Sequence, residues 1–133
     1  KEYLDGIRQL AARQGYVETL LGRRRYFPNL KNPPTPQTRA REEREAINAP
    51  IQGSAADILK LAMIGLPDAL SKAGLQAKLL LQVHDELLLE CPKSELKETA
   101  QLVQNVMENT YQLSIPLLTD ATWGINWGEL QPV

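Results

Sequence analysis

The spacing of apolar and polar residues at the start of the chain predicts a helix followed by a two-stranded hairpin. Apolar side chains recur at helical spacing through residues 2–14, and Gly15 is a typical residue to end a helix. Residues 16–19 and 23–27 are strand-like, and the intervening residues 20–22 are typical of a hairpin turn.

The middle of the chain predicts two helices separated by a proline. Three prolines make residues 32–36 a loop, and Thr38 can cap the Arg- and Glu-rich helix that follows. Pro50 lacks a backbone N–H and restricts the residue before it, so we expect it to kink or break that helix. A second helix with an apolar face is expected over residues 53–72, and Gly74 should end it.

The last part of the chain predicts a second hairpin, a helix and a strand. Residues 76–84 and 87–90 are apolar strands, with two acidic residues as the link between them. Pro92 precedes a further amphipathic helix, for which Ser94 is the expected cap. A final strand is expected over residues 115–123. This order of helices and strands predicts an α+β fold.

Length and composition are those of a globular protein of one domain. The chain has 133 residues, of which 43% are hydrophobic and 23% are charged. No apolar run approaches the roughly eighteen residues that would cross a bilayer, so we expect no membrane span. Cys91 has no cysteine partner, which favours a reducing, cytoplasmic setting. Lys1 stands where a start codon would place Met, so we expect that the start of the chain has been trimmed.

The net charge of −1 conceals an uneven distribution of charge along the chain. Residues 1–44 hold ten Lys and Arg against five Asp and Glu, whereas residues 45–133 hold five against eleven. A basic half joined to an acidic half suits a protein that binds a polyanion with one part and cations with the other. Chance clustering of charges remains the alternative on this observation alone.

Two adjacent acidic residues, Asp85 and Glu86, stand where the two apolar strands should meet. Tight turns favour residues that tolerate positive φ, and neighbouring carboxylates repel each other unless a cation neutralises them. Mg²⁺ prefers carboxylate oxygens, and two such ions about 4 Å apart can drive phosphoryl transfer. An exposed acidic turn with a solvent-facing His84 is the alternative that these residues leave open.

Three polar side chains, Arg44, Asn48 and Gln52, recur at four-residue spacing and should share one helical face. Hydrogen-bond donors of this kind can contact the base-pair acceptors of the minor groove, which lie at nearly the same place for every sequence. A solvated helical face is the alternative. The run of three arginines at residues 23–25 can likewise be a phosphate clamp or a basic edge strand.

Three stretches of the chain together resemble the C-terminal polymerase region of bacterial family-A DNA polymerases. They are GYVETLLGRRRYFPNL at residues 15–30, INAPIQGSAADILKLAMI at residues 47–64, and LLQVHDELLLECP at residues 80–92. They occur in the order and at the approximate spacing that the family has, and the resemblance extends to GINWGEL near the end of the chain. The resemblance implies the C-terminal part of a polymerase palm with adjoining helices.

The resemblance also implies roles for individual residues. Asp85 corresponds to the metal-binding catalytic aspartate of motif C, with Glu86 as its neighbouring acid, and His84 approaches the primer terminus. The minor-groove contacts of the family correspond to the three polar residues at four-residue spacing described above, and Arg25 corresponds to a contact with the primer backbone. The implied cofactor is Mg²⁺, two ions in the intact enzyme. The implied partners are a primer–template DNA duplex and deoxynucleoside triphosphates.

The family's first catalytic aspartate and its nucleotide-binding helix lie upstream, and no matching sequence is present in this chain. We therefore expect residues 1–133 to be a partial polymerase domain that needs this missing upstream segment and cannot add nucleotides alone. Residues 1–74 would supply the helices and Arg-rich hairpin that contact duplex DNA, and residues 75–133 the palm with motif C. The intact enzyme would act in DNA replication and repair, at the nucleoid in the bacterial cytoplasm. The alternative is a free-standing, non-catalytic DNA-binding module or a subunit of a split polymerase.

Overall fold

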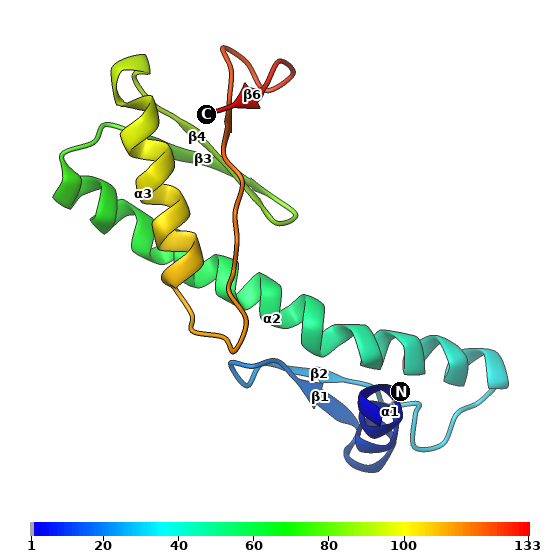
Figure 1. The fold of residues 1–133 in the computed structure, drawn as a ribbon. Helices are drawn as coiled ribbons and strands as arrows, with labels where there is room; N and C mark the ends of the chain where they lie inside the picture. The colour runs from blue at the N-terminus through cyan, green and yellow to red at the C-terminus, as the bar shows by residue number, and fades with distance from the viewer. Residues whose placement is uncertain (1) are drawn as a thin grey trace. The chain divides into compact units, whose positions relative to one another are not determined.

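The computed structural model describes residues 2–133 and shows a mixed α and β chain in which every sheet has two antiparallel strands (Figure 1). The elements in chain order are α1 (Glu2–Gln14), β1 (Tyr16–Glu18), β2 (Arg24–Tyr26), α2 (Pro36–Ala73), β3 (Lys78–Val83), β4 (Glu86–Glu90), the 3₁₀ turn η1 (Lys93–Glu95), α3 (Leu96–Asn109), β5 (Thr122–Trp123) and β6 (Gln131–Pro132). The chain divides into two compact units, one up to Asp57 and the other from Ile58. The α+β class that the sequence predicts is confirmed.

The first unit begins with the predicted helix and hairpin. Gly15 ends α1 with a φ of 80°, and its N–H donates a hydrogen bond to the carbonyl of Ala11 at 2.8 Å. This left-handed conformation is one that glycine adopts without steric cost, which explains why the helix ends there. Strand β1 then pairs with β2, with Val17 opposite Arg25.

The core of the first unit is small and built largely from short side chains. Its buried residues are Ala11, Val17, Phe27, Leu30, Ala46 and Ala49. Two of them, Ala46 and Ala49, come from α2, where their small side chains allow the helix to pack closely on the hairpin. The hairpin and this stretch of α2 are therefore held together by packing as well as by the polar contacts described below.

The structure corrects two expectations for the middle of the chain. Pro50 does not break the helix, because α2 is a single helix of 38 residues. The missing N–H of Pro50 costs one helical hydrogen bond, but Ala46 and Ala49 beside it are buried in the core, and this tertiary packing keeps the segment helical. The cap is also different from the expected one, since the hydroxyl of Thr35 accepts a hydrogen bond from the N–H of Thr38 at 3.1 Å.

The second unit contains the end of α2 and the acidic hairpin. Gly74 ends α2 as predicted, with a φ of 70° and hydrogen bonds from Gly74 N to Ser71 O and from Leu75 N to Leu70 O. These two bonds satisfy carbonyl groups at the end of the helix that would otherwise have no partner. Strands β3 and β4 then pair with a register shift between Leu79 and Leu81.

Two further expectations for the second unit are wrong. Ser94 does not cap α3, because the residue at the N-cap position is Glu95, and no side chain there bonds the helix. The Glu95 carboxylate instead accepts a hydrogen bond from the backbone N–H of Gln76 at 2.8 Å. Of the strand expected over residues 115–123, only Thr122–Trp123 (β5) forms a strand. The segment before it is hydrogen-bonded to side chains of α3 rather than to a neighbouring strand. Gln104 of α3 donates to the carbonyl of Thr119 at 2.6 Å.

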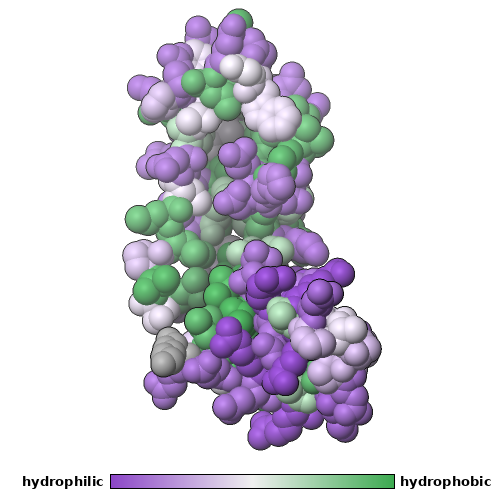
Figure 2. Space-filling model, turned by 90° about the vertical axis from the view of Figure 1, so that its right-hand side faces the viewer, coloured by the Kyte–Doolittle hydropathy of each residue, from purple (hydrophilic) through white to green (hydrophobic). Residues whose placement is uncertain are grey.

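The second unit buries one face of α2 and α3 and leaves several large apolar residues at its surface. Leu66, Leu70 and Val103 are buried, whereas Ile64 is 75% exposed and Leu118 is 84% exposed. Apolar residues are visible among polar ones on the face drawn in Figure 2. Within residues 2–133, none of the helices combines the length and the apolar character that crossing a membrane requires.

Candidate functional site

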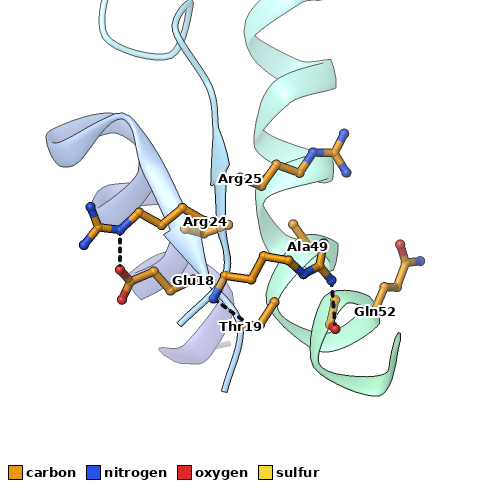
Figure 3. A pocket seen from close by; sticks show the side chains of 9 residues that line it. Glu18, Thr19, Arg24, Arg25, Ala49 and Gln52 are labelled. Atoms are coloured by element: carbon orange, nitrogen blue, oxygen red, sulfur yellow. Dashed lines mark hydrogen bonds and ion pairs between the residues drawn. The ribbon is translucent and has the colours of Figure 1, made fainter. Parts of the chain in front are cut away.

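The Arg-rich hairpin carries its arginines in alternating directions, as a strand requires. Arg24 donates to Glu18 at 2.7 Å and its guanidinium lies 4.5 Å from the centre of the Tyr16 ring. The hydrogen bond with Glu18 raises the pKa of Arg24. Arg25 points to the other side, toward α2 (Figure 3). The residue that the sequence singles out, Arg25, is therefore the one of this pair that faces the long helix.

Arg25 is held by a carboxylate of α2. Its guanidinium donates to Glu45 at 2.7 Å, and Arg41 donates to the second oxygen of the same carboxylate at 2.9 Å. The hydrogen bond from Arg41, together with the charge of both arginines, holds the pKa of Glu45 below its usual range. The same pairing with Glu45 raises the pKa of Arg41. Glu45 therefore remains ionised near neutral pH and fixes the direction in which Arg25 extends.

The three polar residues at four-residue spacing lie on one uninterrupted helix. Arg44, Asn48 and Gln52 all belong to α2, and all three are exposed. Successive members are offset by about 40° around the helix axis, so they form one polar face. The unbroken helix through Pro50 keeps this spacing regular, which a break would have disturbed.

A pocket of about 90 Å³ lies between the hairpin and α2 in the first unit. Arg24, Arg25, Ala49 and Gln52 are among the residues that line it (Figure 3). Gly53 lines it as well. The pocket thus brings together two of the predicted DNA-binding residues, Arg25 from β2 and Gln52 from α2. Its lining includes the side-chain donors of Gln52 and of three arginines, which suit an anionic or acceptor-rich ligand.

The acidic hairpin differs by one residue from the expected arrangement. The two-residue turn is formed by His84 and Asp85, whereas Glu86 already belongs to β4 and pairs with Val83. His84 has a φ of 55°, and among residues 2–133 it is the only residue other than glycine with a positive φ. The side-chain amide of Gln82 donates to the carbonyl of His84. The turn sequence is therefore His-Asp, and histidine tolerates positive φ better than most residues do.

The carboxylates of Asp85 and Glu86 are consecutive and exposed at this turn. Their oxygens are the ligand type that Mg²⁺ prefers, so the donor chemistry fits the implied metal. In the part of the chain that the structure describes, however, no group of three or more His, Cys, Asp or Glu residues could hold a metal ion. The two carboxylates thus fit part of the ligand set of a magnesium site, and the remaining ligands would have to come from residues outside this group.

Sequence reasoning missed the polar residues that attach the hairpin to α2. Asp57 is 7% exposed, and it accepts hydrogen bonds from Thr19 at 2.6 Å and from Arg23 at 2.8 Å. Ser54 accepts a bond from the backbone N–H of Leu20 at 2.9 Å. The available signal was a single acidic residue among Ala, Ile and Leu, since an ionised group on an apolar face requires a partner.

Comparisons with known proteins agree with these features. A family model described as DNA polymerase family A matches residues 1–129. DNA polymerase I of Streptococcus pneumoniae serotype 4 is 54% identical over 129 residues, which is 97% of this chain. DNA polymerase I of Geobacillus stearothermophilus is 51% identical over 127 residues, which is 96% of the chain. The chain spans 15% and 14% of the length of these two relatives.

A solved structure is similar over most of the chain. It is the POL domain of Pol1 from M. smegmatis in complex with a DNA primer–template and dNTP, with a TM-score of 0.81 and 51% sequence identity. The similarity covers 87% of this chain and 20% of that one. The arrangement of helices and hairpins described above is thus one that a much longer polypeptide also contains.

Proposed function

Because the chain belongs to DNA polymerase family A, we propose that it forms part of an enzyme that adds deoxynucleotides to the 3′ end of a primer on a DNA template. The reaction joins the primer 3′-hydroxyl to the α-phosphate of a deoxynucleoside triphosphate and releases pyrophosphate. The enzyme would act in DNA replication and repair at the nucleoid, in the bacterial cytoplasm. The observation that carries the proposal is the pair of exposed carboxylates at the β3–β4 turn in a chain of this family.

In this proposal the β3–β4 hairpin supplies the carboxylates next to which the primer 3′-hydroxyl reacts. Two Mg²⁺ ions, when bound, supply activation of the attacking oxygen and stabilisation of the leaving oxygen. Asp85 provides a ligand at the tip of the turn, and Glu86, the first residue of β4, provides a neighbouring negative charge. His84 lies immediately before them in the turn and is proposed to approach the primer terminus from the minor-groove side.

The first unit is proposed to hold the duplex. Arg44, Asn48 and Gln52 form an exposed row of donors along α2, suited to acceptors that every base pair presents in the minor groove. Arg25 is proposed to contact a phosphate of the primer strand. Within residues 1–74, the hairpin and α2 would thus contact the duplex, and residues 75–133 would form the part of the palm that carries the acidic turn.

Within residues 2–133, no third His, Cys, Asp or Glu joins Asp85 and Glu86 in a group that could hold a metal ion, so the two carboxylates are not a complete set of ligands for two ions. We therefore propose that an upstream segment of the polymerase supplies the remaining carboxylate, and that residues 1–133 alone do not extend a primer. Primer extension by the purified 133-residue chain with Mg²⁺ and all four dNTPs tests this directly. Extension at a rate comparable to that of a whole polymerase would overturn it.

The assignment of Asp85 is tested in the full-length polymerase that carries these residues. Asp85→Asn removes a negative charge without changing the side-chain shape, and we expect extension to fall by roughly 10³-fold or more, the scale for loss of one group from a catalytic unit. Binding of the primer–template duplex should be nearly unchanged. Asp120→Asn, at another exposed aspartate of the second unit, is the matched control and should retain full activity.

The same variants separate the polymerase from its alternative, a DNA-binding module without catalysis. Such a module predicts salt-sensitive duplex binding in a protein that extends no primer, whether or not Asp85 and Glu86 are intact. Full extension by the Asp85→Asn polymerase would show instead that the metal ligand has been assigned wrongly.

A further inference from the structure

The Arg-rich hairpin is attached to α2 through one buried carboxylate. Asp57 is 7% exposed, and its two oxygens have different partners. Oδ2 accepts a hydrogen bond from the hydroxyl of Thr19 at 2.6 Å, and Oδ1 accepts one from Nε of Arg23 at 2.8 Å. These contacts join residues that are 38 and 34 positions apart in the chain. Charge-assisted bonds to a group shielded from water are stronger and more directional than exposed ones.

Further bonds around Asp57 complete the attachment. Arg23 also donates from Nη2 to the carbonyl of Gly53 at 3.1 Å, and its backbone N–H donates to the hydroxyl of Thr19 at 3.1 Å. The N–H of Leu20 donates to Ser54 at 2.9 Å. Both ends of the hairpin turn are therefore bonded to the stretch of α2 from Gly53 to Asp57.

This attachment is adjacent in sequence to two proposed DNA contacts. Arg25 lies two residues beyond Arg23 on β2, and Gln52 immediately precedes Gly53 on α2. Both line the same pocket in the first unit (Figure 3). The exposed side chain of Arg25 extends from a strand of only three residues, so its position depends on where the hairpin is held as well as on its ion pair with Glu45.

We infer that Asp57 is a positioning residue for duplex binding, which holds the hairpin on α2 so that Arg25 and Gln52 contact the same DNA duplex. The inference rests on the proposed function, because it requires that Arg25 contacts a phosphate. Asp57 itself is buried and does not touch the DNA. Its carboxylate accepts from both Thr19 and Arg23, which a carboxamide cannot do with both of its atoms, because the amide nitrogen is a donor.

The experiment measures duplex affinity as a function of salt concentration in the full-length polymerase. Each phosphate contact contributes about 0.9 to the slope of log K against log[salt], which corresponds to roughly eightfold in affinity between 1 M and 0.1 M salt. The proteins are the wild type, Arg25→Ala, Asp57→Asn and the variant with both changes. Asp68→Asn, at an exposed aspartate of the same helix, is the matched control.

We expect Arg25→Ala and Asp57→Asn each to lower the slope by about 0.9 and to weaken binding at 0.1 M salt by roughly eightfold. The variant with both changes should match either single variant, because the phosphate contact can be lost only once. The control should leave slope and affinity unchanged. Loss of folded protein lowers the apparent affinity by the fraction that remains folded. Circular dichroism at each salt concentration measures that fraction, so the slope corrected for it separates positioning from stability.

Two results would overturn the inference in distinguishable ways. If Arg25→Ala lowers the slope but Asp57→Asn does not, the phosphate contact stands and the positioning role is wrong. If Arg25→Ala itself leaves the slope unchanged, the proposed contact is wrong, and the inference with it. Should Asp57→Asn fail to fold, Thr19→Val serves in its place, because it removes one bond to Asp57 with little change in side-chain volume. An unchanged slope when Thr19→Val is combined with Arg23→Gln, which removes the second bond to Asp57, would equally overturn the inference.

Discussion

A methyl group added at position 53 sets helix propensity against packing within the first unit. Gly53 lies inside α2, where alanine is ordinarily the better residue. A Cβ atom built there, however, lies 2.6 Å from Cγ2 of Thr19 and 3.4 Å from Nη2 of Arg23. The first separation is shorter than real Cβ contacts, so Gly53→Ala requires Thr19 or the backbone to move.

The structure indicates which effect is larger. Replacing glycine by alanine inside a helix stabilises it by about 0.5–1 kcal/mol. Overpacking by one methyl group costs about 1–3 kcal/mol. Thr19 cannot avoid the clash cheaply, because rotation of its side chain would take the hydroxyl away from Asp57, to which it donates at 2.6 Å. We therefore expect Gly53→Ala to lower the free energy of unfolding by about 1–2 kcal/mol.

The assay is urea-induced unfolding followed by circular dichroism, with two comparison variants. Gly65→Ala lies in the same helix, where the new Cβ would meet Val106 at 4.0 Å, an ordinary contact. It should stabilise the protein by about 0.5–1 kcal/mol. Thr19→Ser removes Cγ2 and keeps the hydroxyl, so in that background Gly53→Ala should become stabilising by a similar amount.

Two results would refute this reasoning. Stabilisation by Gly53→Ala, equal to that by Gly65→Ala, would show that Thr19 does not press on α2. A destabilisation by Gly53→Ala that persists beside Thr19→Ser would show that Cγ2 is not its cause. The expected coupling between positions 19 and 53, about 1.5 kcal/mol or more, is well above the usual error of a double-mutant cycle.

The remaining predictions concern a helix end, a core residue and an ionised group. Gly74→Ala should lower the free energy of unfolding by about 1–2 kcal/mol, because a φ of 70° strains any residue with a Cβ; urea unfolding measures this. Leu66→Ala should lower the free energy of unfolding by about 2–5 kcal/mol, because Leu66 is fully buried. Ile64→Ala, at a 75% exposed position of the same helix, should change the free energy of unfolding by less than about 0.5 kcal/mol in the same assay. The pKa of Glu45 is lowered in the folded protein, so its stabilising effect is present above the usual glutamate range and is lost as the pH falls through and below that range; a titration followed by NMR should show this pKa rising in Arg41→Gln, and no rise would contradict the assigned cause.

The local elements were predictable because their signals are local. The first helix and hairpin follow from periodicity and from Gly15, whose positive φ ends the helix as expected. The same holds for the end of α2 at Gly74. The caps were not predictable in the same way, because Thr35 and Thr38 can both cap, and the sequence does not show which hydroxyl meets which N–H. In the structure the Thr35 hydroxyl accepts from Thr38.

Errors arose where distant contacts outweigh local preference. The expected break at Pro50 is absent because Ala46 and Ala49, in the helical turn before it, are buried in the core. The acidic link is displaced by one residue because His84 adopts a positive φ that its residue type alone does not demand. The attachment through Asp57 joins residues more than 30 positions apart, and no periodicity in the sequence encodes that pairing.

These differences follow from how each part of the candidate site is built. Asp85 and Glu86 are adjacent in the chain and lie at a two-residue turn, so a short motif is enough to identify them. The proposed duplex contacts Arg25 and Gln52 lie on separate elements, and they share a pocket because core packing and polar bonds together hold the hairpin on α2. A substitution at the acidic turn should therefore act on the chemical step, whereas one at Asp57 should act on DNA affinity at a distance from the DNA.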